Sequence, residues 1–177
     1  MLEPGRQSAR REFVVGLARA AGVSSAILGM LDGTGEAAPR GEETDAAILS
    51  AAVALEHQAI AVYDQGARRS LVPAGLRSYA TEFRGDHAGH RDTQIAILKE
   101  RGAPVPDALE DYHFGPMAAG DDWIRRALTI EIAAQDAYGA LISRIRAKDY
   151  LLSAAFILVD EIRHMTVWRR VLGLKIY

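Results

Sequence analysis

Apolar residues recur at helical spacing through most of this chain. Between Asp45 and Ser70 they follow steps of three and four positions, which places them on one face of a helix. The residues with this spacing are Ile48, Ala52, Leu55, Ala59 and Val62. Helical patterns continue over residues 74–101, 120–147 and 148–172, and no segment has the two-residue alternation of a β-strand. The pattern predicts an all-α domain of four long helices.

Prolines and glycines separate the predicted helices. Val72-Pro73 ends the first helix, and a short link at residues 147–149 joins the last two. Between the second and third helices, residues 102–119 contain three prolines, which disfavour a continued helix. About 17 residues reach about 55–60 Å when extended, whereas a helix of about 27 residues is about 40 Å long. We therefore expect a four-helix bundle of two antiparallel hairpins with a long crossover between helices 2 and 3.

The composition excludes several classes of function. The chain has 177 residues, 49% hydrophobic and 25% charged, which is ordinary for one globular domain with a substantial core. A net charge of -2 indicates no concentrated basic surface, so we expect no nucleic-acid partner. The absence of cysteine excludes disulfides, thiolate zinc sites, rubredoxin-type iron centres and cysteine nucleophiles. Any metal ligands must therefore be nitrogen and oxygen atoms.

Residues 1–41 differ from the rest of the chain. Arg10-Arg11-x-Phe13 resembles the start of a twin-arginine export signal, and an apolar stretch over residues 13–31 follows, interrupted by Arg19. A linker containing Gly and Pro then leads into the bundle, residues 42–177. We expect an exported protein, periplasmic or extracytoplasmic, without a stable transmembrane anchor. The alternative is a cytoplasmic protein whose uncleaved N-terminal helix packs on the domain or on a partner.

Two parts of the chain carry the same pattern of acids and histidines. Glu56 is followed by Asp86-His87-x-x-His90, and Glu131 is followed by Asp160-Glu161-x-x-His164. The two glutamates are 75 residues apart, and the members of the two pairs are 74 residues apart. A bundle that binds two ions in its core needs one carboxylate from each of two helices and an i, i+3 pair from each of the others. The predicted ligands are Glu56, His87, His90, Glu131, Glu161 and His164.

Other residues near these positions are candidates for supporting roles. Asp86 and Asp160 each precede a predicted ligand, and we expect them to accept hydrogen bonds from the ligating histidines across the two hairpins. The imidazole and carboxylate ligands of the predicted set favour two iron ions, with manganese as the variant, over copper(I) or structural zinc. His57 lies about 100° around its helix from the adjacent glutamate, so we expect it not to bind metal.

Tyr63 and Tyr138 each lie seven residues after a glutamate and on the same helix face. They are candidates to line the site, to hydrogen-bond a ligand or to relay an electron. Packing in the core with a satisfied hydroxyl is the alternative for both. Gln135, one turn after the second glutamate, either touches a bound ligand or makes a hydrogen bond inside the bundle.

The spacing from Glu131 to Asp160-Glu161-x-x-His164 resembles the signature of the ferritin-like di-iron carboxylate superfamily. Leu55-Glu56-His57-Gln58-Ala59, with the export signal, resembles the exported bacterial ferritin-like domain proteins. The resemblance covers about residues 44–172 and implies a ferritin-like bundle in which five of the six predicted ligands match family positions. The sixth differs, because His87 stands where the family usually has glutamate. The lost negative charge is expected to lower the affinity for a trivalent pair, to change the order of binding, or to leave one site weak.

Two hypotheses of function follow. The first is a di-metal oxidoreductase, di-iron in the first place, that reacts with dioxygen or hydrogen peroxide in ferroxidase-like or peroxide-removing chemistry. It needs no catalytic residue beyond the metal ligands, and its electrons come from Fe(II) itself or from an outside donor. The second is a metal-binding or metal-free bundle that serves structure or assembly, with helix faces paired in a homodimer.

Overall fold

The computed structural model describes residues 42–176, and the export signal and linker expected over residues 1–41 lie outside the described residues. The described chain contains four α-helices and one short 3-10 turn, η1. In chain order these are α3 (Glu42–Arg68), η1 (Ala74–Leu76), α4 (Arg77–Glu100), α5 (Asp121–Ile142) and α6 (Lys148–Val171). No β-strand occurs in residues 42–176. The all-α prediction is confirmed.

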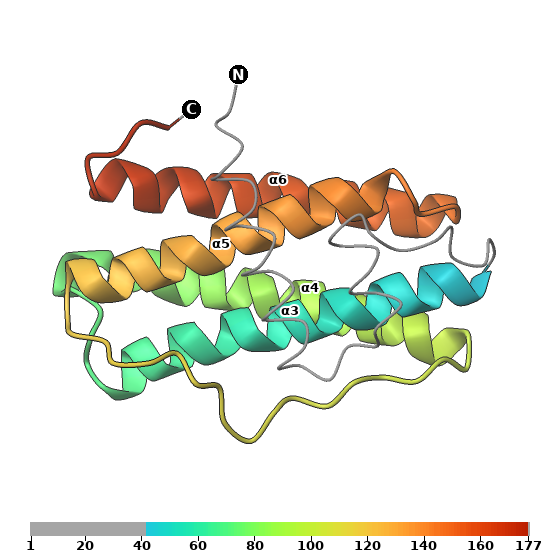
Figure 1. Cartoon of the computed structure of the whole chain (residues 1–177), viewed down its shortest axis with the longest axis horizontal. Helices are drawn as coiled ribbons and strands as arrows, with labels where there is room; N and C mark the ends of the chain where they lie inside the picture. Colours follow the sequence, from blue (N-terminus) through green and yellow to red (C-terminus); the bar gives the residue numbers. More distant parts are fainter. Residues whose placement is uncertain (1–41, 177) are drawn as a thin grey trace.

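The helices form a four-helix bundle of two hairpins (Figure 1). α3 packs on α4 and α5 packs on α6, while α3 against α5 is the main contact between the hairpins. The segment between α4 and α5 runs along the length of the bundle and brings the chain back to the end where α4 began (Figure 1). This is the long crossover between the second and third helices that the sequence predicted.

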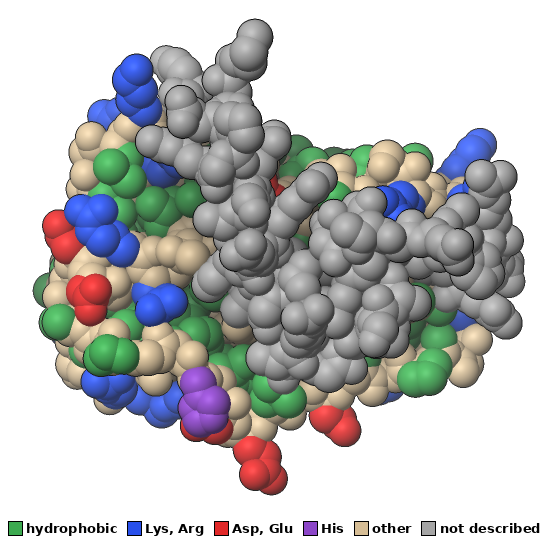
Figure 2. All heavy atoms as spheres, viewed as in Figure 1, with side chains coloured by type: hydrophobic (Ala, Val, Ile, Leu, Met, Phe, Trp, Pro, Cys, Tyr) green, Lys and Arg blue, Asp and Glu red, His purple; other side chains and the backbone are tan. Residues whose placement is uncertain are grey.

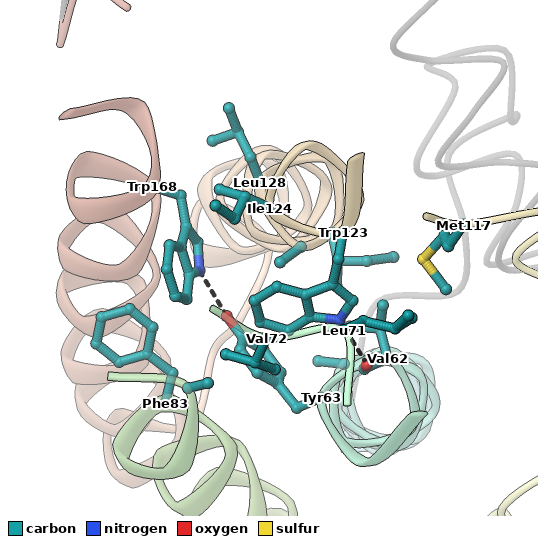
Figure 3. Packing of buried hydrophobic residues seen from close by; sticks show 14 of the residues in the cluster. Val62, Tyr63, Leu71, Val72, Phe83, Met117, Trp123, Ile124, Leu128 and Trp168 are labelled. Atoms are coloured by element: carbon teal, nitrogen blue, oxygen red, sulfur yellow. Dashed lines mark hydrogen bonds between the residues drawn. The ribbon is translucent and has the colours of Figure 1, made fainter. Parts of the chain in front are cut away.

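The core consists of two hydrophobic clusters, one towards each end of the bundle. The first contains Trp123 and Trp168 (Figure 3), and the second contains Tyr150 and Leu98. Burial of each such large side chain stabilises the fold by about 1.5–3 kcal/mol. α3 is long and apolar enough to cross a membrane, but 72% of its most apolar window lies inside the bundle, as in the core helix of a soluble domain. In each helix the predicted metal ligands fall between the residues of the two clusters.

The crossover is attached to the bundle by side chains and by its backbone. Phe114 and Met117 are buried in the first cluster. Gly120 N–H donates to the carbonyl of Leu71 at 3.0 Å, and Ser50 Oγ donates to the carbonyl of Pro104 at 3.1 Å. The long segment therefore covers α3 and adds to the core.

The third helix ends earlier than predicted. The sequence pattern placed its end near residue 147, whereas α5 ends at Ile142 and residues 143–147 form the link to α6. The cause is a contact from the start of α3, because the buried carboxylate of Asp45 accepts the backbone N–H groups of Arg146 and Ala147 at 2.9–3.2 Å. This contact lies about 100 residues away in sequence, so helical periodicity could not show it.

Candidate metal centre

Six side chains from four helices meet in the middle of the bundle. α3 and α5 contribute one glutamate each, and α4 and α6 contribute one pair each at i and i+3, which share a helix face. Five of the six residues are at most 2% exposed, and the side chain of His90 is 12% exposed. The six are Glu56, His87, His90, Glu131, Glu161 and His164. The structure brings together all the residues that the sequence pattern singled out.

These residues form two overlapping groups, and within each group the ligand atoms lie within 4.8 Å of one another. The first, named the Glu56 half, consists of Glu56, His87, His90 and Glu161. The second, named the Glu131 half, consists of His87, Glu131, Glu161 and His164. His87 and Glu161 belong to both halves, so the two groups share one imidazole and one carboxylate.

His87 lies at the centre of the cluster, where its ring contacts all three glutamates. Its Nδ1 lies 2.8 Å from Glu56 Oε2 and 3.5 Å from Glu161 Oε1, and its Nε2 lies 3.4 Å from Glu131 Oε1. Burial by itself lowers the pKa of His87, but the charges of Glu161 and Glu131 and the hydrogen bonds to the glutamates raise it well above its ordinary value. The three glutamates therefore hold this imidazole at the centre of the cluster by charge and by hydrogen bonds.

The two glutamates of the Glu131 half differ in their electrostatic environments. Burial raises the pKa of Glu131, but His87 and His164 outweigh burial and lower it. Burial also raises the pKa of Glu161. The histidines only partly oppose this rise and the charges of Glu56 and Glu131 add to it, so the pKa lies well above its ordinary value. Glu161 is thus a buried carboxyl group with too little positive charge around it to favour its ionised form.

An aspartate orients each of the other two histidines. His90 Nε2 lies 3.2 Å from Asp160 Oδ2, and His164 Nε2 lies 3.1 Å from Asp86 Oδ2. A carboxylate oxygen accepts a hydrogen bond, so each Nε2 carries the hydrogen and each Nδ1 presents its lone pair to the cluster. Both pairs join α4 to α6, and thus one hairpin to the other.

Arg163 connects these two aspartates at the surface of the bundle. Its guanidinium nitrogens lie 2.5 Å from Asp86, 3.5 Å from Asp160 and 2.8 Å from Glu82. The Arg163 side chain is 44% exposed, so each ion pair is weak in energy. The arrangement nevertheless keeps both carboxylates positioned towards the histidines.

Two tyrosines donate hydrogen bonds to the single glutamates of α3 and α5. Tyr63 on α3 donates to Glu131 on α5, and Tyr138 on α5 donates to Glu56 on α3 at 2.5 Å. Burial raises the pKa of both tyrosines well above the ordinary value, and the adjacent glutamate charges add to the rise. Both hydroxyls therefore keep their hydrogen at neutral pH. The tyrosines are core residues that also touch the cluster, so the two interpretations left open by the sequence are compatible.

Each tyrosine hydroxyl also accepts a hydrogen bond from a further side chain. Trp168 Nε1 donates to Tyr63 at 2.8 Å (Figure 3), and Gln94 Nε2 donates to Tyr138 at 2.5 Å. Since each hydroxyl has one donor next to it, its own hydrogen is directed towards the glutamate. The cluster is thus supported by a hydrogen-bond chain on each side.

Gln135 has its neighbour in the sequence, Asp136, as its hydrogen-bond partner. Its side chain is half-buried and its amide donates to Asp136 at 3.4 Å. Tyr138, seven residues after Glu131, is the residue of α5 that donates a hydrogen bond to a clustered glutamate.

The remaining histidines of the bundle lie outside the cluster. His57 is half-buried, and burial together with the charge of Arg91 lowers its pKa. The side chain of His113 is 91% exposed and lies 3.2 Å from Asp111 in the crossover. His57 is not among the clustered residues, as expected from its angle on the helix.

Four residues around the cluster were not identified from the sequence. Gln94 and Trp168 each follow a clustered histidine by four positions, so the same internal repeat would have pointed to them. Phe83 stacks on the ring of His164 with a centroid distance of 4.0 Å. Arg163 and Phe83 carry no signal of this kind, since their contacts depend on how α4 and α6 pack.

The donor atoms of the cluster fit a metal ion. Five of its buried atoms have no hydrogen-bond partner among the described residues: Glu131 Oε2, Glu161 Oε1 and Oε2, His90 Nδ1 and His164 Nδ1. A buried polar atom without a partner costs about 1–3 kcal/mol, and a cation between these atoms would remove that cost. Nitrogen and carboxylate ligands of this kind suit iron and manganese better than copper(I).

Comparisons with known proteins agree with this architecture. A family model described as "Ferritin-like domain" matches residues 44–174. The chain is also similar to the crystal structure of a conserved hypothetical protein, rv2844, from Mycobacterium tuberculosis, with a TM-score of 0.69 and 27% sequence identity. That similarity covers 74% of this chain and 98% of the other. No curated protein matches the chain. The region matched by the family model includes all six residues of the cluster.

Proposed function

Because the chain belongs to the ferritin-like domain family, we propose that its buried cluster binds two metal ions and supports oxidoreductase chemistry. We propose iron as the first choice, manganese as the variant, and dioxygen or hydrogen peroxide as the reactant. The observation that supports this proposal best is the set of five unpartnered buried nitrogen and oxygen atoms at the centre of the bundle. Packing alone would not retain such atoms, because each of them destabilises the fold.

The residues of the two halves have separate tasks in this proposal. Glu56 and His90 belong to one ion, Glu131 and His164 belong to the other, and Glu161 is shared. Bound iron would supply the electron-transfer chemistry that these side chains lack. The chain itself excludes water, because the two hydrophobic clusters enclose the site at both ends. It also keeps two neutral tyrosine donors beside the glutamates.

The source of electrons separates the two forms of the proposed activity. In a ferroxidase-like reaction Fe(II) is itself the substrate and becomes Fe(III). In peroxide removal an external donor supplies two electrons for each peroxide that is reduced to water. The chain has no cysteine and therefore no thiolate-bound iron centre of its own to deliver these electrons.

The proposal is tested first by metal content. Protein purified without a metal-binding tag is analysed by elemental mass spectrometry for iron and manganese, before and after anaerobic loading with Fe(II). Dioxygen and peroxide consumption are then followed on the loaded protein. We expect up to two ions per chain and consumption faster than that of free Fe(II).

A matched pair of variants controls this experiment. Glu161→Gln removes the shared carboxylate and is expected to abolish metal binding, whereas Asp92→Asn changes an exposed carboxylate on the same bundle and leaves it intact. No metal after anaerobic loading would refute the proposal. Metal binding without consumption of either oxidant would leave a metal-binding bundle without catalysis.

A second candidate function is assembly through one exposed helix face. Five of the eight large hydrophobic residues exposed within residues 45–176 lie close together on α6. They are Leu151, Leu152, Phe156, Val159 and Ile162, here named the α6 face. We propose a second copy of the chain as its partner. Two antiparallel α6 helices would bring the acidic first turn of each, with Asp149, towards the basic last turn of the other, with Arg169 and Arg170.

A further inference from the structure

The two halves of the cluster differ in whether their own glutamate has an oxygen without a hydrogen bond. Both oxygens of Glu56 already accept hydrogen bonds, Oε1 from Tyr138 at 2.5 Å and Oε2 from His87 Nδ1 at 2.8 Å. Both halves contain the two unpartnered oxygens of Glu161 and one unpartnered histidine nitrogen, Nδ1 of His90 or of His164, but among the described residues only the Glu131 half adds an unpartnered oxygen of its own glutamate, Oε2 of Glu131. Protein donors therefore occupy both oxygens of Glu56, whereas in Glu131 they occupy Oε1 and leave Oε2 free.

The ring of His87 adds to this asymmetry. Its contact with Glu56 at 2.8 Å is an ordinary N–H···O distance, whereas its contact with Glu131 at 3.4 Å is longer than such bonds normally are. The hydrogen of a neutral imidazole is therefore better placed on Nδ1, where it is donated to Glu56. A neutral imidazole has one lone pair. That lone pair then lies on Nε2, which faces the Glu131 half.

We propose that the cluster binds its two ions unequally and in a fixed order. The first divalent cation binds in the Glu131 half, to His87 Nε2, Glu131, Glu161 and His164 Nδ1. The second ion binds in the Glu56 half, where both oxygens of Glu56 already accept hydrogen bonds and His87 offers no lone pair. This inference rests on the proposed metal binding and specifies which residues bind first.

The difference in affinity follows from the hydrogen bonds at Glu56 with which the second ion competes. One or two bonds to a charged group correspond to about a ten- to hundred-fold change in a dissociation constant. The ligands of the first ion are two imidazole nitrogens and two carboxylates, which suit a first-row divalent cation such as Mn(II). The whole Glu131 half is buried, so water competes little for the first ion.

Equilibrium dialysis of the full chain against increasing Mn(II) tests the order. Elemental mass spectrometry gives the ions bound per chain, and low-temperature electron paramagnetic resonance separates isolated Mn(II) from spin-coupled pairs. We expect one ion per chain with an isolated signal, then a second ion and a coupled signal at Mn(II) concentrations about ten- to hundred-fold higher.

Two variants at equivalent positions assign the halves. His164→Ala removes a ligand of the Glu131 half, and His90→Ala removes one of the Glu56 half. We expect His164→Ala to lose the tight ion and His90→Ala to keep it while losing only the second. Circular dichroism and thermal melting check that both variants fold. If His164→Ala does not fold, the near-isosteric pair Glu131→Gln and Glu56→Gln is used in the same way.

Each result has one meaning. No Mn(II) or Fe(II) bound to the unmodified chain refutes metal binding itself, and the inference with it. Two ions bound with equal affinity to the unmodified chain leave the proposed function standing and overturn the unequal order. Loss of the tight ion in His90→Ala with its retention in His164→Ala also overturns the proposed order.

Discussion

At the scale of single residues, position 87 sets the charge balance of the cluster. Three buried carboxylates come from Glu56, Glu131 and Glu161, and His87, which contacts all three, is an imidazole and not a fourth carboxylate. Two divalent ions carry four positive charges, so a cluster with three carboxylates has one positive charge uncompensated when both ions bind. Uncompensated charge in a buried site is unfavourable, which weakens the second ion.

Replacement of His87 by glutamate is expected to strengthen metal binding. The new carboxylate supplies the fourth negative charge and removes the N–H that occupies Glu56. We expect the second ion to bind at least about tenfold more tightly and iron oxidation to be faster. Equilibrium dialysis with elemental mass spectrometry measures the first effect. His113→Glu, at a side chain that is 91% exposed, is the control. Unchanged binding in His87→Glu would mean that residue 87 is not part of the site.

At the scale of helices, three of the four end in the same way. Ser70, Gly102 and Gly173 each follow a helix with a positive φ. After each of these residues the next N–H returns to the last turn of the helix, as in the bond from Leu71 N to Gly66 O at 2.8 Å. Glycine adopts positive φ without strain, whereas serine does so at a cost because of its Cβ. α3 therefore ends at a strained residue where α4 and α6 end at a relaxed one.

Substitutions at two of these helix ends are expected to act in opposite directions. Ser70→Gly should raise the free energy of unfolding by about 0.5–1 kcal/mol because it relieves the strain at φ 53°. Gly102→Ser should lower it by about 1 kcal/mol, although there is open space for its Cβ, because it introduces the same strain. Urea denaturation followed by circular dichroism measures both. A change of the same sign in the two variants would contradict the explanation.

The α6 face is a second property of a single helix. α6 packs along α5 and has fewer contacts with α4, which leaves its outer side uncovered. On the side of the molecule drawn in Figure 2, basic and acidic side chains are scattered among apolar ones. The α6 face differs from such a mixed surface, because its exposed residues, among them Phe156 at 65% and Val159 at 63% exposed, are all apolar and lie on one helix. A cluster of this kind is typical of an interaction surface.

A charge placed on the α6 face is expected to prevent self-association. Phe156→Glu should convert a dimer of the unmodified chain to a monomer, because the carboxylate would be buried at the centre of the interface. Size-exclusion chromatography with light scattering measures the mass of each form. Leu174→Glu, at an exposed apolar residue outside the α6 face, should remain dimeric. A monomeric unmodified chain would rule out this partner.

At the scale of the whole molecule, the two hairpins are related by an approximate internal symmetry. Tyr63 reaches Glu131, and Tyr138 reaches Glu56, so each hairpin supplies a donor to the carboxylate of the other. The donors behind the tyrosines differ, since Trp168 stands in one half and Gln94 in the other. These differences, with His87 opposite Glu161, make the halves of the cluster unequal.

Asp45 joins the two hairpins at one end of the bundle. Its carboxylate is 1% exposed and accepts backbone hydrogens from Arg146 and Ala147. We expect Asp45→Ala to lower the free energy of unfolding by about 1.5–3 kcal/mol, because hydrogen bonds to a charged group are lost. Chemical denaturation measures the change, and Asp107→Ala at an exposed position is the control. Metal content should not change, since Asp45 lies about 16 Å along α3 from Glu56. An unchanged stability would show that the contact does not contribute.

Much of the fold and of the cluster could be predicted from the sequence because both are periodic. The i and i+3 pairs and the tyrosines seven residues from the glutamates depend only on the geometry of a helix. Gln135 makes a side-chain hydrogen bond to Asp136, and its contact with a bound ligand stays a prediction. The predicted end of α5 was wrong, since it depends on Asp45 from the other hairpin.

The sequence by itself determined four helices, the long crossover and a repeated set of carboxylates and imidazoles, since helical period and chain length decide which residues share a face. Only the tertiary structure decided how the faces meet. It places Asp86 against His164, Arg163 between the two aspartates, and Nδ1 of His87 closer to Glu56 than Nε2 is to Glu131. The physical reason is that hydrogen bonds and ion pairs across helices depend on contacts of a few ångströms between distant residues, which no local pattern encodes.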